Sequence, residues 1–294
     1  MDLSAHNNLV ETEWLEDNLD NPTIRIIECT SLLPNYFEED ADQGLVKESG
    51  LSLWEDSHIV GSGFADILGE LSDQSNTHFM YAMPGAEQFS AVMSSLGVGD
   101  GIGVVLYDRQ VNMWASRLWV MLRRFGFDNA VVLNGGWTKW EAEGRPVSND
   151  KPQFPRTVFK AKPRDGVIAT HEDVLEAIQD QNSALINALD PDEFAGRGPK
   201  RYARAGRISS SVNVPFSQTA DPETSMFKSD DELKDIFGAV NTLNKNKLIC
   251  YCGGGIAASS TTLLLTRLGI ENVALYDGSM QEWASDSSLP MEYD

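Results

Sequence analysis

The sequence repeats itself once, and this repeat limits the possible fold more than any other feature. Residues 122–140 (LRRFGFDNAVVLNGGWTKW) align with residues 265–283 (LTRLGIENVALYDGSMQEW) at an offset of 143. Upstream, GVVLYD at 103–108 aligns with KLICYC at 247–252 at an offset of 144. Two copies are too few for a solenoid, and 294 residues suffice for two domains of ordinary size. The repeat therefore predicts two tandem globular domains.

Each copy alternates short apolar runs with segments of helical periodicity. The apolar runs are unbroken, which is typical of parallel strands that are buried on both faces of a sheet. The expected strands are Ile24–Ile27, Gly103–Tyr107, Ala130–Leu133, Ala184–Ile186, Val212–Val214, Leu248–Tyr251 and Val273–Tyr276. The expected helices are Glu87–Ser95, Met113–Phe125, His171–Gln179, Asp230–Phe237 and Ile256–Leu268. The pattern predicts an α/β fold in each copy.

A stretch with little periodicity separates the copies. Residues 145–165 contain four prolines, as expected of a linker. We therefore predict a first domain over residues 1–148, a linker over 149–165 and a second domain over 166–294.

The chain is strongly acidic, which narrows the choice of partners. Its 23 Lys and Arg residues against 44 Asp and Glu residues give a formal net charge of −21. Such a surface repels nucleic acid and anionic lipid, so neither is expected as a partner. No apolar run reaches the roughly 18 residues of a membrane helix, and the N-terminus does not read as a signal peptide. Three cysteines are too few for a disulfide framework, so we expect a reducing, cytoplasmic setting.

One segment runs from an apolar strand through a cysteine and three glycines into a helix of small residues. It reads Cys252-Gly253-Gly254-Gly255-Ile256-Ala257. Ligands bind beyond the carboxyl ends of parallel strands, where glycines and a helix N-terminus let amide N–H groups converge. Converging amides favour a thiolate, so Cys252 is the candidate nucleophile and the five residues after it are the candidate anion-binding loop. The alternative is a tight turn with a buried cysteine, the role expected for Cys250 and Cys29.

A basic cluster in so acidic a chain is the second candidate. Residues 197–207 contain five cations and no acid, and their Gly-Pro and Ala-Gly content favours a loop. We interpret Arg197, Lys200, Arg201 and Arg204 as a cationic rim that brings a small anion to the cysteine. The alternative is an ordinary solvated loop.

These motifs resemble those of the tandem-domain rhodanese family of sulfurtransferases. The resemblance is carried by residues 251–257, by Asp277-Gly278-Ser279 with Trp283, and by Asn134-Gly135-Gly136, and it extends from Leu9 to Pro290. It implies two rhodanese-like domains, each with a parallel sheet of about five strands flanked by helices. It also implies a site between the domains and a first domain without the nucleophile, where Asp108 stands at the position of Cys252.

The resemblance implies a two-step sulfur transfer that needs no metal or organic cofactor. Cys252 takes the sulfane sulfur of a small anionic donor, thiosulfate or 3-mercaptopyruvate, and forms a persulfide that the loop amides stabilise. An acceptor then removes the sulfur: cyanide, glutathione or another thiol such as thioredoxin. The sequence departs from the family patterns at Gly253, which is not basic, at Gly254, which has no hydroxyl, and at Leu189 and Glu193, where arginines are usual. The donor is therefore left open.

Other functions fit parts of the sequence. A sulfur-carrier or binding module would accept sulfur from a protein partner on Cys252 without turning over a small donor. A cysteine phosphatase clamps phosphate with an arginine six residues after its cysteine, where this chain has Ala258. A metal site at the Cys-x-Cys motif lacks nearby histidines. His58 is expected to order a loop, and His78 stays open as a further catalytic candidate.

Overall fold

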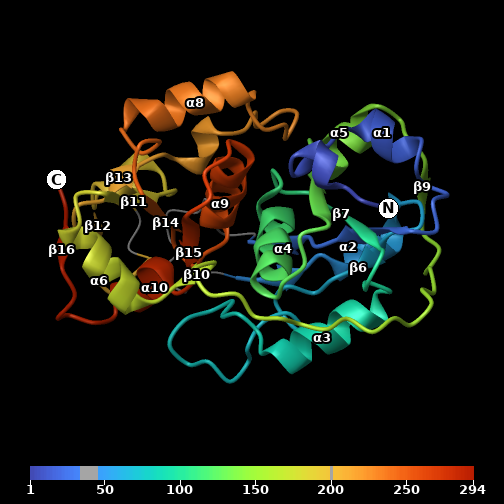
Figure 1. Ribbon diagram of the computed structural model, residues 1–294, viewed down its shortest axis with the longest axis horizontal. Coiled ribbons are helices and arrows are strands. Elements are labelled where there is room, and N and C mark those ends of the chain that lie inside the picture. Colours follow the sequence, from blue (N-terminus) through green and yellow to red (C-terminus); the bar gives the residue numbers. More distant parts are fainter. Residues whose placement is uncertain (34–45, 199–200) are drawn as a thin grey trace.

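A computed structural model shows the chain as two α/β domains that pack side by side (Figure 1). It describes residues 1–33, 46–198 and 201–294. Each domain is built on a five-stranded sheet in which all neighbouring strands are parallel. Helices flank both sheets (Figure 1). The predicted fold class, two tandem α/β domains with parallel sheets, is confirmed.

The sheet of the first domain has the strand order β1-β8-β7-β2-β6. In that order the strands are β1 (Leu9–Val10), β8 (Ala130–Leu133), β7 (Gly103–Tyr107), β2 (Ile24–Glu28) and β6 (Gly63–Phe64). The other elements are η1 (Ser4–His6), α1 (Thr12–Glu16), β3 (Ser31–Leu32), β4 (Glu48–Ser49), α2 (Leu51–Asp56), β5 (His58–Ile59), α3 (Ala86–Ser95), α4 (Met113–Arg124), α5 (Gly136–Ala142) and β9 (Val147–Ser148). Every residue of β2, β7 and β8 is buried, as expected of a parallel sheet that is covered on both faces.

The sheet of the second domain repeats this arrangement in the order β10-β15-β14-β11-β13. In that order the strands are β10 (Ile168–Ala169), β15 (Val273–Tyr276), β14 (Lys247–Tyr251), β11 (Ser183–Asn187) and β13 (Val212–Asn213). The other elements are α6 (His171–Gln179), α7 (Pro191–Phe194), β12 (Arg207–Ile208), η3 (Phe216–Gln218), α8 (Asp230–Ala239), α9 (Ala257–Arg267), α10 (Ser279–Trp283) and β16 (Met291–Glu292). The aligned sequence blocks thus occupy the same places in both domains.

The domains meet along α4 and α9, which lie side by side in the centre of the molecule (Figure 1). Residues 114–122 of α4 and 258–265 of α9 are all buried. A helix that is buried all round is covered on both sides, here by its own sheet and by the other domain. Because α4 follows β7 and α9 follows β14, the carboxyl ends of these two strands lie beside the domain interface.

Residues 149–165, the predicted linker, contain no helix or strand and run along the first domain. The Phe159 N–H donates to Ser94 Oγ (2.9 Å), and the Lys162 N–H donates to the Phe125 carbonyl (2.8 Å). The segment is therefore held against the ends of α3 and α4 before the second domain begins. The domain boundaries themselves stay a prediction.

Candidate active site

Cys252 lies where β14 ends and the turn into α9 begins, at the carboxyl edge of the second sheet. It is 3% exposed, whereas Cys250 within β14 and Cys29 after β2 are completely buried. Burial raises the pKa of the Cys250 thiol to about 12. Burial, together with the charges of Asp108 and Glu28, raises the pKa of Cys29. The placement of Cys29 and Cys250 fits the structural role expected for them.

The start of α10 holds the backbone of the loop after Cys252. The Cys252 N–H donates to Ser279 Oγ (3.1 Å), and the Cys252 carbonyl accepts from the Met280 N–H (3.1 Å). The Gly253 carbonyl accepts from the Gln281 N–H (3.0 Å). In a trans peptide the C=O and the following N–H point in opposite directions. The amide groups of residues 253 and 254 therefore point away from α10.

The three glycines of the loop are required by their surroundings. A β-carbon at Gly253 would collide with the Tyr202 hydroxyl, and one at Gly254 would lie 2.5 Å from Gln281 Nε2. Gly255 has a φ of +77°, which favours glycine, and its β-carbon would lie 3.0 Å from the carbonyl oxygen of Asp277. Each glycine lets a different neighbour approach the backbone.

The loop presents amide N–H groups that no described residue accepts. Across residues 1–33, 46–198 and 201–294, the amides of Gly254, Ile256 and Ala258 have no acceptor. Buried amides are normally paired. This group of donors, with the N-terminus of α9, is suited to hold an anion next to the cysteine sulfur.

In the matching turn of the first domain, a similar set of amides binds an anion. Asp108 is buried, and its carboxylate accepts four amide hydrogen bonds of 2.6–3.0 Å. The donors are the N–H groups of Gln110, Asn112, Trp114 and Ala115. The pKa of Asp108 is raised overall, because the effect of burial is larger than the opposing effect of these hydrogen bonds. We call such a set of converging amides an amide cradle. In the first domain the cradle is occupied by the carboxylate of Asp108.

A buried ion pair between the domains lies directly behind the loop. Arg117 of α4 is completely buried, and its Nη1 lies 2.6 Å from Oδ1 of Asp277, the residue after β15. Its Nη2 donates to the Tyr81 carbonyl (2.5 Å), and the Met83 N–H donates to Asp277 Oδ2 (2.9 Å). A β-carbon at Gly255 would lie 3.2 Å from Arg117 Nη1. Arg117, which the sequence analysis missed, therefore ties the turn to the first domain.

Two of the predicted rim cations are paired with acids of the same segment. Arg197 has a side chain that is 58% exposed and lies 3.1 Å from Asp192 Oδ1. Arg201 has a side chain that is 6% exposed and lies 3.3 Å from Glu193 Oε1. Both charges are thus partly neutralised before any ligand binds.

The other two residues of the predicted rim are Arg204 and Lys200. Arg204 donates to backbone carbonyls at the end of the second domain, including that of Leu289 (2.8 Å). Lys200 lies outside the described residues. The segment nevertheless borders the loop after Cys252, because the Tyr202 hydroxyl lies against Gly253. A role of Arg197, Lys200, Arg201 and Arg204 in substrate binding stays a prediction.

The two histidines lie in different surroundings. His58 is completely buried in β5, stacked on Trp54 at a ring distance of 4.4 Å, with its Nδ1 2.6 Å from the Trp54 carbonyl. This placement fits the loop-ordering role predicted for it. His78 lies in the segment of the first domain that borders the second, at the edge of a cavity.

That cavity measures about 300 Å³ and lies between residues 68–81 and α10. Its lining includes Lys47, His78, Tyr81 and Gln281. Gln281 also lies against the loop after Cys252, as its distance from a β-carbon at Gly254 shows. Only His78 of this set was predicted from the sequence. Gln281 lies within the second repeat block, and no sequence pattern marks Lys47.

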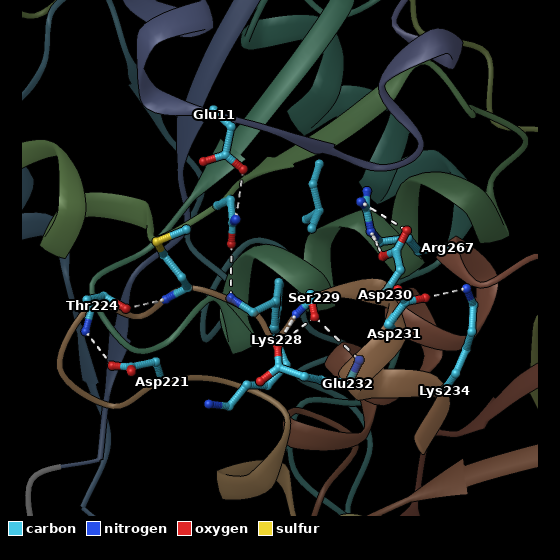
Figure 2. A pocket seen from close by; sticks show the side chains of 14 residues that line it. Glu11, Asp221, Thr224, Lys228, Ser229, Asp230, Asp231, Glu232, Lys234 and Arg267 are labelled. Carbon is cyan, nitrogen blue, oxygen red and sulfur yellow. Dashed lines mark hydrogen bonds and ion pairs between the residues drawn. The ribbon is translucent and has the colours of Figure 1, made fainter. Parts of the chain in front are cut away.

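A larger cavity of about 730 Å³ lies elsewhere at the domain boundary, and residues 252–257 do not line it (Figure 2). Four of its charged side chains form two ion pairs. Arg267 lies 2.7 Å from Asp230, and Lys234 lies 2.9 Å from Asp231. These pairs are drawn in Figure 2. We assign no function to this cavity, which lies apart from residues 252–257.

Within the described part of the chain, all three cysteines are free. The same residues contain no group of three or more His, Cys, Asp or Glu side chains arranged to hold a metal ion. None of the described helices has the length and apolar character needed to cross a membrane.

Comparison with known proteins identifies related sequences over almost the whole chain. The profile of the rhodanese-like domain matches twice, at residues 11–143 and 170–286. A Mycobacterium bovis protein provisionally named thiosulfate sulfurtransferase 1 is 32% identical over 293 residues, 97% of each chain. The 3-mercaptopyruvate sulfurtransferase of Escherichia coli is 30% identical over 291 residues, 96% of this chain and 97% of the other.

Solved structures show the same two-domain arrangement. The crystal structure of SseA from Escherichia coli matches with a TM-score of 0.80 and 28% identity, over 92% of this chain and 98% of that one. The anaerobic ergothioneine biosynthesis enzyme of Chlorobium limicola matches with a TM-score of 0.79 and 22% identity, over 99% of this chain and 71% of that one. At that identity the second match bears on the fold alone.

Proposed function

Because the chain belongs to the rhodanese-like family and is a sulfurtransferase of the thiosulfate or 3-mercaptopyruvate type, we propose that it transfers sulfur through a persulfide on Cys252. The observation that carries this proposal is the set of amides around Cys252 that have no acceptor in the described chain. An outer persulfide sulfur is anionic near neutral pH and suits these donors in the way a carboxylate suits those of the first domain.

The first step loads the cysteine. The Cys252 thiolate attacks the outer sulfur of thiosulfate or the thiol sulfur of 3-mercaptopyruvate, and a Cys–S–S bond forms as the donor's bond to that sulfur breaks. With 3-mercaptopyruvate the leaving group is the pyruvate enolate, which takes a proton to give pyruvate. With thiosulfate the leaving group is sulfite. The amides of Gly253, Gly254, Gly255, Ile256 and Ala257 are the proposed persulfide-stabilising loop.

The second step unloads it. A nucleophilic acceptor attacks the outer sulfur, the S–S bond breaks, and the Cys252 thiolate is restored. Cyanide would give thiocyanate, and glutathione or thioredoxin would take the sulfur as a persulfide. We further propose a reducing, cytoplasmic setting, which the three free cysteines support. The rim of Arg197, Lys200, Arg201 and Arg204 is proposed to attract the donor.

A sulfur-carrier module is the second candidate, and one observation favours it. The described rim arginines pair with Asp192 and Glu193 or with backbone carbonyls, which weakens recognition of a small free anion. Such a module would load Cys252 once from a protein partner and turn over small donors slowly. Steady-state turnover with 3-mercaptopyruvate or thiosulfate would exclude it.

Intact mass spectrometry tests the proposal. After exposure to each donor, the protein should gain about 32 Da, one sulfur atom, and lose it on addition of cyanide. Cys252→Ser should gain nothing, whereas the matched variant Cys250→Ser should still gain one sulfur. Equal loading of Cys252→Ser, or turnover without an adduct on the cysteine, would contradict the proposed mechanism.

A further inference from the structure

The cavity between residues 68–81 and α10 contains a cation without a carboxylate partner. Lys47 lines it, with its ammonium 5.4 Å from the centre of the Tyr81 ring and in contact with the Met80 sulfur. No described carboxylate pairs with this ammonium. The acid in the same lining, Asp73, is engaged in its own turn, where its Oδ1 accepts from the Ser75 N–H (2.9 Å). The cavity therefore contains one cation and one acid, and the cation is the group that no described carboxylate pairs with.

Tyr81 adds a neutral donor to the same cavity. The residue is 7% exposed, and its hydroxyl is buried without a partner in the described chain. Burial raises the pKa of this phenol, which therefore stays protonated and able to donate. Its backbone has a φ of +63°, a strained conformation for an aromatic residue. Strain and an unpaired buried hydroxyl in one residue are typical of a binding site.

Gln281 supplies a third donor and connects the cavity to the cysteine. Its Oε1 accepts from the Met80 N–H (2.8 Å), which fixes the orientation of the amide and turns Nε2 the other way. That Nε2 lies beside Gly254 and has no acceptor among the described residues. Gln281 Nε2 therefore links the lining of the cavity to Gly254, the second residue after Cys252.

We propose that this cavity anchors the sulfur donor and that its ligand is a short 2-oxo acid. The Lys47 ammonium binds the carboxylate, and the Tyr81 hydroxyl and Gln281 Nε2 donate to the carboxylate and the 2-oxo oxygen. This inference rests on the proposed function, and it favours 3-mercaptopyruvate over thiosulfate. The cationic rim then attracts the donor from a distance, while the cavity fixes its position.

Binding of pyruvate to the Cys252→Ser protein tests this assignment, because pyruvate has the carboxylate and the 2-oxo group but no sulfur to transfer. Lys47→Met should weaken pyruvate binding about tenfold or more, and Tyr81→Phe about threefold, as expected for losing a charged and a neutral hydrogen bond. Lys151→Met, which removes an exposed lysine that pairs with Glu55, is the matched control and should leave binding unchanged. Circular dichroism confirms that each variant is folded.

The same variants in the active protein separate the two proposals. Lys47→Met should raise the KM for 3-mercaptopyruvate about tenfold with little change in kcat, and should affect thiosulfate less. If pyruvate does not bind, or binds Lys47→Met as tightly as the parent, the anchor is wrong even where Cys252 still forms a persulfide. If pyruvate binding depends on Lys47 but no persulfide forms with any donor, the anchor stands and the proposed sulfur transfer fails.

Discussion

The turns that follow β7 and β14 have matching backbones, but they differ in the side chain that faces their amides. Helices α4 and α9 begin at Met113 and Ala257, the same distance after Asp108 and Cys252, and Val111 and Gly255 both have positive φ, +56° and +77°. In the first turn a carboxylate accepts the converging amides. In the second turn a thiol stands at that position, and in the proposed mechanism the open amides bind the anionic persulfide.

The difference shows how a repeated fold divides stability and reactivity between its copies. A buried donor without an acceptor lowers stability by about 1–3 kcal/mol, so an open cradle persists where function requires it. The second turn is supported from outside, by Ser279 of its own domain and by Arg117 and Tyr81 of the other. The first domain thus contributes contacts to the candidate site, but it has no cysteine at the matching position.

The largest effect is expected when the second turn is made to resemble the first. Cys252→Asp should abolish sulfur transfer, by at least about a thousandfold, because the nucleophile is gone. It should also raise the thermal midpoint above that of Cys252→Ser, since a carboxylate can accept the open amides. Activity assays and thermal unfolding check both. A Cys252→Asp protein less stable than Cys252→Ser would contradict the view that the two cradles are equivalent.

Alkylation compares the three cysteines directly. At about pH 8, iodoacetamide should modify Cys252 at least about a hundredfold faster than Cys250 or Cys29. Burial raises the pKa of Cys250 to about 12 and raises that of Cys29, so both remain protonated thiols at pH 8. Both are also completely buried. Peptide mapping by mass spectrometry measures the rates. Labelling of Cys250 at a similar rate would show that exposure or cradle geometry differs from that described.

Removing the carboxylate from the first turn should destabilise the whole domain. Asp108→Ala leaves four buried amides without an acceptor and should lower the free energy of unfolding by about 3 kcal/mol. Asp73→Ala removes an exposed carboxylate that accepts from Ser75, and it should have a much smaller effect. Urea unfolding measures both. If Asp108→Ala is as stable as Asp73→Ala, water or another group replaces the carboxylate without loss, and the first turn is not a filled cradle.

A smaller effect is expected at the matched positions of left-handed backbone. Val111→Gly relieves a β-branched residue at φ +56° but also removes a side chain that packs against the core, so the protein's free energy of unfolding should change by less than about 1 kcal/mol. The reverse change, Gly255→Val, should destabilise it and reduce sulfur transfer, because a β-carbon there meets Asp277 and Arg117. Thermal unfolding and steady-state assays measure the pair. A loss of stability in Val111→Gly as large as that in Gly255→Val would contradict the view that both turns need the same left-handed backbone.

Much of this comparison could be predicted from the sequence, because it depends on local patterns. The repeat and the unbroken apolar runs predict two parallel sheets, and the order strand, cysteine, glycines, helix predicts the turn at Cys252. Contacts that form only when the domains dock could not be predicted in this way. Arg117 reads as one cation in an apolar helix, and Lys47 and Tyr81 belong to segments without periodicity, so their convergence on the turn follows from tertiary packing. Arg197 is a different case, because its partner Asp192 lies only five residues earlier in the same segment, just outside the residues 197–207 in which the cations were counted.

Substitutions in the cationic rim should have the smallest effect, because its charges are already partly neutralised by neighbouring acids. Arg197→Ala combined with Arg201→Ala should raise the KM for the donor about threefold, since exposed or neutralised charges contribute mainly long-range attraction. High salt should raise the KM of the parent protein and bring it close to that of the variant, because screening removes such attraction. Lys151→Ala is the control for loss of a distant cation. An unchanged KM at low salt would eliminate the rim and leave donor recognition to Lys47 and the cavity beside Gly254.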